Sequence, residues 1–268
     1  MLELVPTPIG NIGDISLRAI EALSEADILL CEDTRVTKKL INLLKDRYNT
    51  PFKENQQFFS LHSHNEDEFL NSIDKEIFDK NVVYVSDAGM PSVSDPAQKL
   101  IAFAQQNSIA YDVLPGANAA LCAYVASGFV GKEMLFFGFL PHKGADRESE
   151  LKKALNSGYV AVVYESVHRI EKLLDEIDKK APTREIFVAK EISKRYQEYH
   201  KGFAKDIKKS LKNIKGEFVV VLSAGSSKLN SAIDVEDIMA LDISTKQKAK
   251  LIAKITGENP KSIYSSLI

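Results

Sequence analysis

The sequence predicts an α/β protein of two domains, and three observations carry this prediction. Short apolar segments alternate with helical patterns of about 10–15 residues, which indicates βαβ units and a largely parallel sheet. The length of 268 residues favours two domains at roughly 100–150 residues each. Hydrophobic residues make up 44% of the chain and charged residues 27%, so a sizeable core can be buried.

The first half of the chain shows the alternation most clearly. Leu17, Ile20 and Leu23 recur at helical spacing after the first apolar segment, and further strands and helices follow in turn. We therefore expect an N-terminal α/β domain over residues 1–116. Its predicted strands are Leu2–Val5, Asp27–Cys31, Phe58–Leu61, Val82–Val85 and Ala110–Leu114, and its other helices are Val36–Leu44, Asn65–Phe78 and Pro96–Gln106.

The second half begins with a helix of small residues, Ala117–Ser127, and predicts a second α/β domain over residues 117–226. Its later connections are shorter, which indicates a mixed sheet. A small helical tail over residues 227–268 holds two short helical patterns, interrupted at Gly257–Pro260. The predicted strands of the second domain are Met134–Gly138, Tyr159–Tyr164, Ile186–Ala189, Gln197–Phe203 and Phe218–Leu222.

The charge balance and the cysteines limit the classes of function. The chain has 35 basic and 37 acidic residues, a net charge of −2, so only a local basic patch could hold a polyanion. Cys31 and Cys122 lie in apolar runs, so we expect buried free thiols in a reducing compartment. We expect a cytoplasmic protein, because the first residues lack a signal-peptide pattern and no apolar run reaches about 18–20 residues.

Three loops that directly follow predicted strands are candidates for ligand binding, because open α/β sheets bind ligands at the carboxyl ends of their strands. The first is Pro6–Asp14, where prolines fix the backbone and glycines permit a close approach. A tight turn in which Asp14 or Ser16 caps the next helix explains this loop equally well.

The other two loops carry the same ambiguity. In residues 85–96 we assign Ser86–Gly89 to a ligand and Asp95–Pro96 to a helix cap. The small residues of Leu114–Ala120 can admit a flat ligand or let two domains pack closely. Three such loops in one chain are harder to explain by chance than any one of them.

Several rival chemistries lack their motifs in this sequence. It contains neither the Gly-x-x-x-x-Gly-Lys-Ser/Thr loop of nucleotidases nor the Gly-x-Ser-x-Gly elbow of α/β-hydrolases. His62 and His64 are two residues apart, but the carboxylate spacing that supports a metal site is absent, so we predict no metal.

Taken in order along the chain, the loops closely resemble the ribosomal RNA small-subunit methyltransferase I family of the tetrapyrrole-methylase superfamily. Spaced identities in this order are highly specific, and they cover essentially the whole chain. The chain departs from the family at Met90, at Ala117–Asn118 and at Val167, where threonine, Pro-Ser and proline are usual. The segments that carry the resemblance are Thr7–Asn11, Cys31–Arg35, Ser60–Glu66, Ser86–Pro91, Gly138–Pro141, Tyr164–Arg169, Ala189–Glu191 and Gly216–Phe218.

This resemblance implies two α/β domains of the tetrapyrrole-methylase (class III methyltransferase) type, with S-adenosyl-L-methionine folded in the cleft between them. It implies 2′-O-methylation of a cytidine ribose in 16S rRNA of the small ribosomal subunit, and we expect a homodimer. The cofactor contacts that it implies are Pro8, Ser86, Asp87, Gly89, Met90, Val93 and Ser94 from the first domain, and Asn118, Ala119, Phe139, Leu140 and Val163 from the second.

A ribose hydroxyl is a poor nucleophile while protonated, so a nearby base helps its methylation by about 10²–10⁴-fold. Two pairs are candidates, Glu32 with Asp33 and Lys190 with Glu191, and the sequence does not decide between them. Arg35 can hold a phosphate bidentately, through two of its guanidinium N–H groups. The structural alternative is an internal ion pair of Glu32 with Arg35.

A basic segment is the predicted contact with RNA. Between residues 190 and 215 there are nine Lys or Arg and three acidic residues, with two tyrosines that can stack on bases. Lys194, Arg195 and Lys201 are the residues that we select, and a solvated helix face is the alternative. Should they fail, the RNA contact is to be sought near Arg35, Lys38 and Lys39 or the tail lysines 246, 248, 250 and 254.

Two other functions compete with rRNA methylation. A methylase of a tetrapyrrole or another small molecule would have little use for the basic segment. A non-catalytic RNA-binding assembly factor need not bind S-adenosylmethionine at all.

Overall fold

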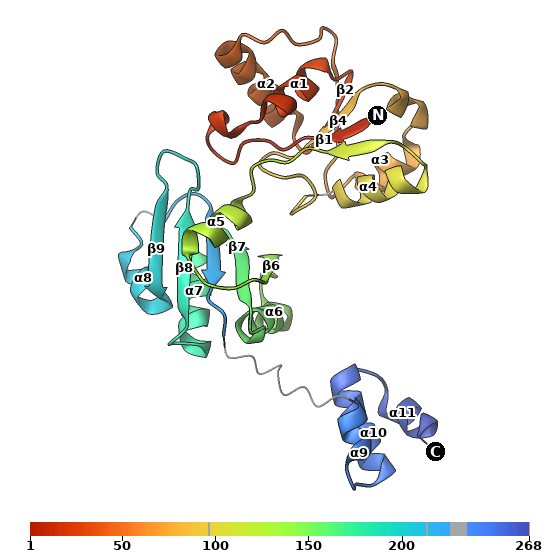
Figure 1. The fold of residues 1–268 in the computed structure, drawn as a ribbon, viewed down its shortest axis with the longest axis vertical. Helices are drawn as coiled ribbons and strands as arrows, with labels where there is room; N and C mark the ends of the chain where they lie inside the picture. The colour runs from red at the N-terminus through yellow and green to blue at the C-terminus, as the bar shows by residue number, and fades with distance from the viewer. Residues whose placement is uncertain (96, 213, 226–234, 268) are drawn as a thin grey trace.

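The computed structural model describes residues 1–95, 97–212, 214–225 and 235–267. Within these ranges two five-stranded sheets lie one after the other along the chain, followed by a set of short helices (Figure 1). The α/β fold class predicted from the sequence is therefore confirmed. The sheets are described first, because the loops at their ends form the candidate site.

The first sheet is entirely parallel, with strand order β3-β2-β4-β1-β5. Every residue of β2 and β4 is buried, as expected of central parallel strands covered on both faces. This confirms the parallel sheet that the alternation of strands and helices predicted. The strands are β1 (Leu2–Leu4), β2 (Ile28–Cys31), β3 (Gln57–Ser60), β4 (Val82–Val85) and β5 (Tyr111–Val113).

Helices cover both faces of this sheet (Figure 1). α1 (Leu17–Glu25) and α2 (Thr34–Tyr48) pack on one face, and α3 (Glu66–Ser72) and α4 (Ala97–Gln106) pack on the other. The predicted helix Asn65–Phe78 is not continuous. α3 ends at Ser72, and the Asp74 side chain then accepts a hydrogen bond from the Glu76 amide and starts a separate 3₁₀ turn, Lys75–Asp79.

The second sheet is mixed, as predicted, with strand order β6-β7-β10-β8-β9. β6 and β7 are parallel, whereas β10 runs antiparallel to both β7 and β8, and β9 antiparallel to β8. Of the antiparallel pairs, only β8–β9 joins consecutive strands through a short connection. The strands are β6 (Met134–Phe139), β7 (Val160–Glu165), β8 (Glu185–Lys190), β9 (Glu198–Phe203) and β10 (Phe218–Leu222).

Helix coverage of the second sheet is unequal. α6 (Gly144–Asn156), α7 (Ile170–Lys180) and α8 (Ala204–Ser210) form the main core with one face, and α5 (Ala119–Ser127) packs on the other. α5 buries Ala120 and Ala123 and exposes Cys122 on its outer side. The expectation of a buried Cys122 is therefore wrong. Cys31 is buried in β2, and burial raises the pKa of its thiol to about 11.

The tail holds three short helices, not the two patterns predicted. α9 (Val235–Ala240), α10 (Thr245–Thr256) and α11 (Pro260–Ser266) share a small core of Ile238, Ala249, Ile252 and Ile263. Gly257 ends α10 in the left-handed conformation, and Pro260 occupies the first turn of α11, where its missing N–H costs nothing. No helix in the described ranges is long and apolar enough to cross a membrane.

Candidate active site

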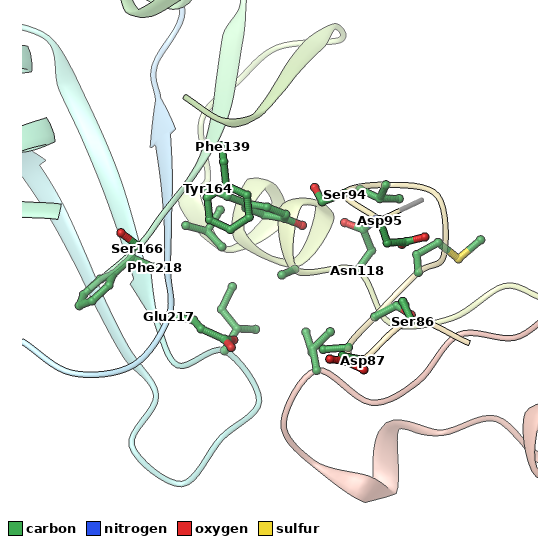
Figure 2. Close-up of a pocket in the computed structure, with 18 of the residues that line it drawn as sticks. Ser86, Asp87, Ser94, Asp95, Asn118, Phe139, Tyr164, Ser166, Glu217 and Phe218 are labelled. Atoms are coloured by element: carbon green, nitrogen blue, oxygen red, sulfur yellow. The ribbon is translucent and has the colours of Figure 1, made fainter. Parts of the chain in front are cut away.

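A cavity of about 510 Å³ lies between the two sheets and is lined by loops from both (Figure 2). Its volume is within the roughly 300–1,000 Å³ that is usual for small-molecule sites. On the first sheet it lies at the carboxyl ends of β1, β2 and β4, and the loops after β1 and β4 are among those predicted to bind a ligand. Nine of the twelve predicted cofactor contacts line it, namely Ser86, Asp87, Gly89, Met90, Val93, Ser94, Asn118, Ala119 and Phe139.

The other three predicted contacts lie elsewhere. Pro8 does not line the cavity, although its neighbour Ile9 does, and Leu140 is buried in the core of the second domain. Val163 points from β7 into the core beneath α6, α7 and α8. The next residue, Tyr164, lines the cavity instead. Neighbouring residues of a strand point to opposite faces, so an offset of one residue exchanges core and cavity.

The sequence analysis missed several lining residues, among them Ile9, Tyr164, Ser166, Ile192 and the run 216–219, and Tyr164 is the most informative. Its ring lies edge-on to Phe136 and Phe139, with centroids 4.9 and 5.5 Å away. Tyr164 and Phe139 both line the cavity and form an aromatic side of it (Figure 2). The Tyr164 hydroxyl accepts a hydrogen bond of 3.1 Å from the Ala120 amide at the start of α5. Residues of a strand alternate between its two faces, so Tyr164 lies on the face opposite to Val163. That alternation was the signal that could have identified it.

Backbone contacts join the first two loops. The Thr7 amide donates to the Gly89 carbonyl at 3.0 Å, and the Gly89 amide donates back to Thr7 at 3.1 Å. Gly89 has φ +84°, a conformation that glycine adopts without strain. The loop 6–14 thus supports the ligand loop Ser86–Gly89, and its residue Ile9 also lines the cavity. Ser16, not Asp14, caps α1 by accepting a bond of 3.1 Å from the Ala19 amide.

The cap predicted in the second loop is present at Asp95, whose carboxylate accepts bonds from the Ala97 and Ser92 amides. Pro96, the other half of that prediction, lies outside the described residues. In the third loop the Asn118 side chain caps α5 through the Leu121 amide at 3.0 Å. The Asn118 side chain therefore both begins a helix and borders the cavity.

Two carboxylates at the cavity bind each other's loops. Glu32 Oε2 accepts a bond of 3.1 Å from the Asp87 amide, and Asp87 Oδ1 accepts one of 3.0 Å from the Asp33 amide. Burial raises the pKa of both Glu32 and Asp87. Glu32 is thus the one member of the two predicted catalytic pairs whose side chain lines the cavity.

Asp33 and Arg35 pair with each other beside the cavity. Asp33 caps α2, and Arg35 Nη2 lies 2.6 Å from its carboxylate, which lowers the pKa of Asp33 to about 2. The internal ion pair considered for Arg35 therefore forms with Asp33 and not with Glu32. The Arg35 side chain is 89% exposed, so its outer nitrogens face solvent.

Lys190 and Glu191 have other partners. Lys190 is buried, with Nζ 3.2 Å from Glu198 Oε1. The Glu191 carboxylate accepts from Lys194 Nζ at 2.9 Å and from the Glu217 amide at 3.0 Å. Burial of Glu191 opposes ionisation, but these bonds outweigh it and lower the pKa. Neither Lys190 nor Glu191 lines the cavity.

The loops of the two domains also meet beside the cavity. The Ser193 hydroxyl donates to the Asp14 carboxylate. Gly10 packs so closely on Lys194 that an added Cβ would lie 2.4 Å from its Cγ. The small residue in the first loop therefore lets the two domains approach.

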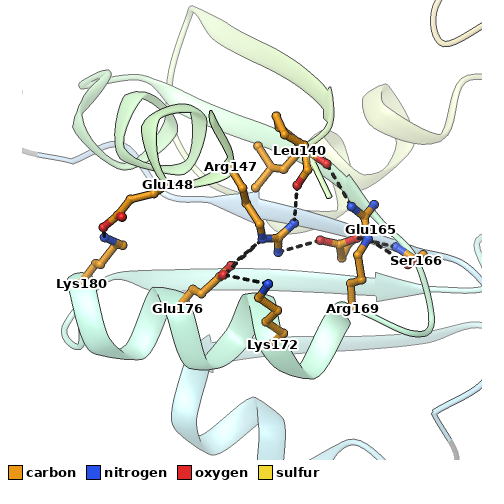
Figure 3. A network of polar contacts seen from close by, with 10 residues as sticks. Leu140, Arg147, Glu148, Glu165, Ser166, Arg169, Lys172, Glu176 and Lys180 are labelled. Carbon is orange, nitrogen blue, oxygen red and sulfur yellow. Dashed lines mark hydrogen bonds and ion pairs between the residues drawn. The ribbon is translucent and has the colours of Figure 1, made fainter. Parts of the chain in front are cut away.

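A buried network of charges holds the second-domain wall (Figure 3). The Glu165 side chain is fully buried, and its two oxygens lie 2.8 Å from Arg169 Nε and 3.0 Å from Arg147 Nη2. Arg147 also donates to the Pro141 carbonyl, and Arg169 to the Leu140 carbonyl. The ends of β6 and β7, which carry Phe139 and the residues 164–167 of the cavity wall, are thereby tied together.

The predicted RNA contacts lie outside the cavity. Lys194 Nζ bonds Glu191 and Glu217. Lys201 Nζ donates to the Ser127 carbonyl and lies 4.6 Å from the centre of the Phe129 ring. Arg195 is exposed, above the Tyr196 ring.

Metal ligands do not converge in the part of the chain that the structure describes, where no group of three His, Cys, Asp or Glu residues could hold an ion. His62 and His64 lie beside each other with ring centroids 5.9 Å apart. The polar groups of the cavity are carboxylates, hydroxyls and an amide next to aromatic rings, which suits an organic cofactor.

Comparison with known proteins identifies the family. The tetrapyrrole (corrin/porphyrin) methylases match residues 1–208. Ribosomal RNA small subunit methyltransferase I of Campylobacter fetus subsp. fetus is 47% identical and covers 100% of both chains. The protein of the same name from Helicobacter pylori (strain J99) is 41% identical, over 98% of this chain and 96% of that one.

Among solved structures, uroporphyrin-III C-methyltransferase from Thermus thermophilus, complexed with S-adenosyl homocysteine, matches with a TM-score of 0.55. The match covers 82% of this chain and 96% of that one at 14% identity, and so shows a shared fold. The full-length identity to the curated relatives is far higher. The chain belongs to the ribosomal RNA small subunit methyltransferase I family of the tetrapyrrole methylases.

Proposed function

We propose that this protein transfers a methyl group from S-adenosyl-L-methionine to the ribose 2′-oxygen of a cytidine in 16S rRNA of the small ribosomal subunit. The observation that carries the proposal is the cavity, because nine of twelve cofactor contacts implied by the family resemblance line it. The relatives named ribosomal RNA small subunit methyltransferase I support RNA as the substrate. On the same ground we propose that the enzyme acts in the cytoplasm.

The residues present fit this cofactor. Phe139, Tyr164 and Val167 offer an apolar surface for a flat base, while Ser86 and Asp87 offer hydrogen-bonding groups for a ribose or an amino acid. When bound, S-adenosylmethionine supplies a methyl group that is already activated by its sulfonium. The protein's main contribution is then to position the acceptor, which can account for most of the barrier reduction.

Glu32 is the side chain that we assign to the acceptor proton. It lines the cavity, and burial raises its pKa, which makes the carboxylate a stronger base. The Asp87 amide holds one of its oxygens in place. Asp33 is a weaker candidate, because its pairing with Arg35 lowers the pKa to about 2.

We also infer a homodimer, formed through the outer side of α5. Leu121 is 52% exposed and Val125, one helical turn later, is 76% exposed, so the side of α5 that faces away from the sheet carries apolar surface. Val130, 96% exposed, follows shortly after the helix. Such exposed apolar groups favour a protein partner. Val125→Asp should then convert the dimer to a monomer in sedimentation equilibrium, and a wild-type protein that is already monomeric would refute this.

The test of the function is transfer of labelled methyl groups to small subunits from a strain that lacks this protein, followed by mapping of the label. We expect one labelled cytidine, and loss of the label when that position is 2′-deoxycytidine, because the nucleophile is then missing. Label on the deoxy substrate would indicate base methylation. Calorimetry that detects no binding of S-adenosylmethionine would favour the non-catalytic assembly factor.

A further inference from the structure

Most charge in the basic segment between residues 190 and 215 is used within the fold. Four of its nine basic residues form ion pairs with carboxylates, and a fifth, Lys201, donates to a backbone carbonyl. Two of the partners, Asp175 and Glu217, lie outside the segment, so its excess in sequence overstates the positive charge at the surface. The ion-paired residues are Lys190, Lys194, Lys208 and Lys209.

Helix α2 differs from that segment. It carries five basic residues, Arg35, Lys38, Lys39, Lys45 and Arg47, against one acidic residue. Arg35 pairs with Asp33, but no described carboxylate lies within 4.0 Å of the other four. These cations keep their full charge toward solvent, where phosphates can displace only water and small ions.

The basic residues of α2 are arranged along the helix. Thr37, Ile41 and Leu44 face the core, so helical geometry places Arg35, Lys38, Asn42 and Lys45 in sequence along one flank, with Lys39 next to them on the exposed side. From Arg35 to Lys45 the helix rises about 15 Å, at about 1.5 Å per residue. We call Arg35, Lys38, Lys39, Asn42 and Lys45 the basic face of α2.

Two lysines of this face are held over aromatic rings. Lys38 Nζ lies 4.8 Å from the centre of the Phe58 ring on the edge strand β3, and Lys45 Nζ lies 5.3 Å from that of Phe52. Cation–π contacts at exposed sites are weak, about 0.5–1 kcal/mol. They nonetheless limit the motion of long side chains, which lowers the entropy lost on binding.

The basic face begins at the cavity. α2 is capped by Asp33, whose amide donates to Asp87, and Glu32 immediately before it lines the cavity. A nucleotide strand with its ribose beside Glu32 would therefore pass Arg35 first and then the lysines. We propose that the basic face of α2 binds the phosphates of the rRNA strand that adjoins the target nucleotide. This rests on the proposed function, since it names how the same substrate is held.

The test compares two triple variants that remove equal charge. Lys38→Gln, Lys39→Gln and Lys45→Gln change the basic face, whereas Lys152→Gln, Lys179→Gln and Lys205→Gln change exposed lysines of α6, α7 and α8 on the far face of the second sheet. Glutamine retains helix propensity, so both proteins should fold. Binding to assembled small subunits is measured over a range of salt concentrations.

We expect the α2 triple variant to bind small subunits roughly 100-fold more weakly at 0.1 M salt, and its log–log salt slope to fall by about two to three. The control triple should change neither quantity appreciably. Both should bind S-adenosylmethionine as the wild type does, because neither alters the cavity. An α2 variant with wild-type affinity and slope, or one that matches the control, overturns the proposal.

A cross-linking experiment tests position independently of affinity. A photoreactive amino acid replaces Asn42 on the basic face or Lys152 on the control face. The cross-link from residue 42 should map within a few nucleotides of the methylated cytidine, and residue 152 should give none there. If the protein still methylates the cytidine but residue 42 cross-links only to remote rRNA, the assignment of the basic face is overturned and the proposed function is not. A wild-type protein that methylates no rRNA refutes the proposed function itself.

Discussion

The first-domain wall of the cavity keeps its carboxylates Glu32 and Asp87 partly exposed, whereas the second-domain wall buries one of its two, Glu165, completely and leaves Glu217 exposed. Glu32 accepts a hydrogen bond from the Asp87 amide, and Asp87 accepts one from the Asp33 amide. Glu165 instead lies between Arg147 and Arg169 with no exposed side-chain area. One backbone amide leaves most lone pairs of a carboxylate available to a ligand, whereas Glu165 already accepts from two arginines and the Ser166 amide.

This difference suggests that the first wall binds the ligand, whereas the buried network of the second wall stabilises the fold. A buried charge without its partner is very costly, so the second wall is rigid as long as its network is complete. The first wall lies near solvent, so its groups can change partner without a large cost in folding free energy. We therefore expect changes in the second wall to affect stability first, and changes in the first wall to affect ligand affinity first.

Arg147→Ala should have the largest effect. It leaves the Glu165 carboxylate buried with one cation fewer and should lower the free energy of unfolding by about 3–5 kcal/mol. Arg18→Ala is the matched control, because the Arg18–Asp112 pair is largely exposed, with 62% and 51% of the side chains accessible, and should cost less than about 1 kcal/mol. Urea denaturation measures both, and equal losses would contradict the contrast between buried and exposed charge.

Asp87→Ala should change affinity more than stability. The variant loses a charged acceptor at the cavity, and hydrogen bonds to charged groups are worth about 1.5–3 kcal/mol, or roughly 10- to 150-fold in affinity. Calorimetric titration with S-adenosylmethionine measures the loss. Asp46→Ala, on the exposed side of α2, is the control and should bind normally. Unchanged affinity of the Asp87 variant would remove this residue from the cofactor site.

Asn118→Ala tests the segment between the two walls. It removes the cap of α5 and should lower the unfolding free energy by about 1 kcal/mol. Asn118→Ser should retain most of the stability, because serine caps nearly as well as asparagine. Thermal unfolding distinguishes the two. A serine variant as unstable as the alanine variant would show that the cap is not the source of the effect.

The smallest expected effects are in the pH dependence of stability. Burial raises the pKa of Glu32 above its usual 4.5, so the folded state binds this proton more tightly than the unfolded chain does. The stability of the wild type relative to Glu32→Gln should therefore fall as pH rises from 4.5 through the folded pKa. Denaturation of both proteins between pH 4 and 7 measures this, and a constant difference would contradict it.

Asp33 should behave with the opposite sign. Arg35 lowers its pKa from 3.8 to about 2, so its contribution is present above pH 3.8 and is lost as pH falls toward 2. Asp33→Asn should remove that dependence. Asparagine also caps helices well, so this variant should keep the N-cap of α2 and change only the charge at residue 33.

Much of the fold was predictable because its signals are local. The five strands of the first sheet follow the alternation of apolar segments and helices, and both the parallel sheet and the mixed sheet are confirmed. The helix Asn65–Phe78 was wrong because an Asp74 cap within it was not recognised. The family prediction is also confirmed, while the domain boundaries at 116/117 and 226/227 and the roles of the site residues stay predictions.

The sequence by itself determined the fold class, the family and the ligand loops at the carboxyl ends of β1, β4 and β5, because hydrophobic period and motif order are properties of neighbouring residues. Only the tertiary structure decided which charges remain available. Lys194 and Lys201 are engaged by groups far away in the chain, Glu217 and Ser127, whereas Lys38 faces solvent over Phe58. Electrostatic interactions depend on distance in space, so counting lysines along the chain could not distinguish a lysine that is already paired from one that is available to a ligand.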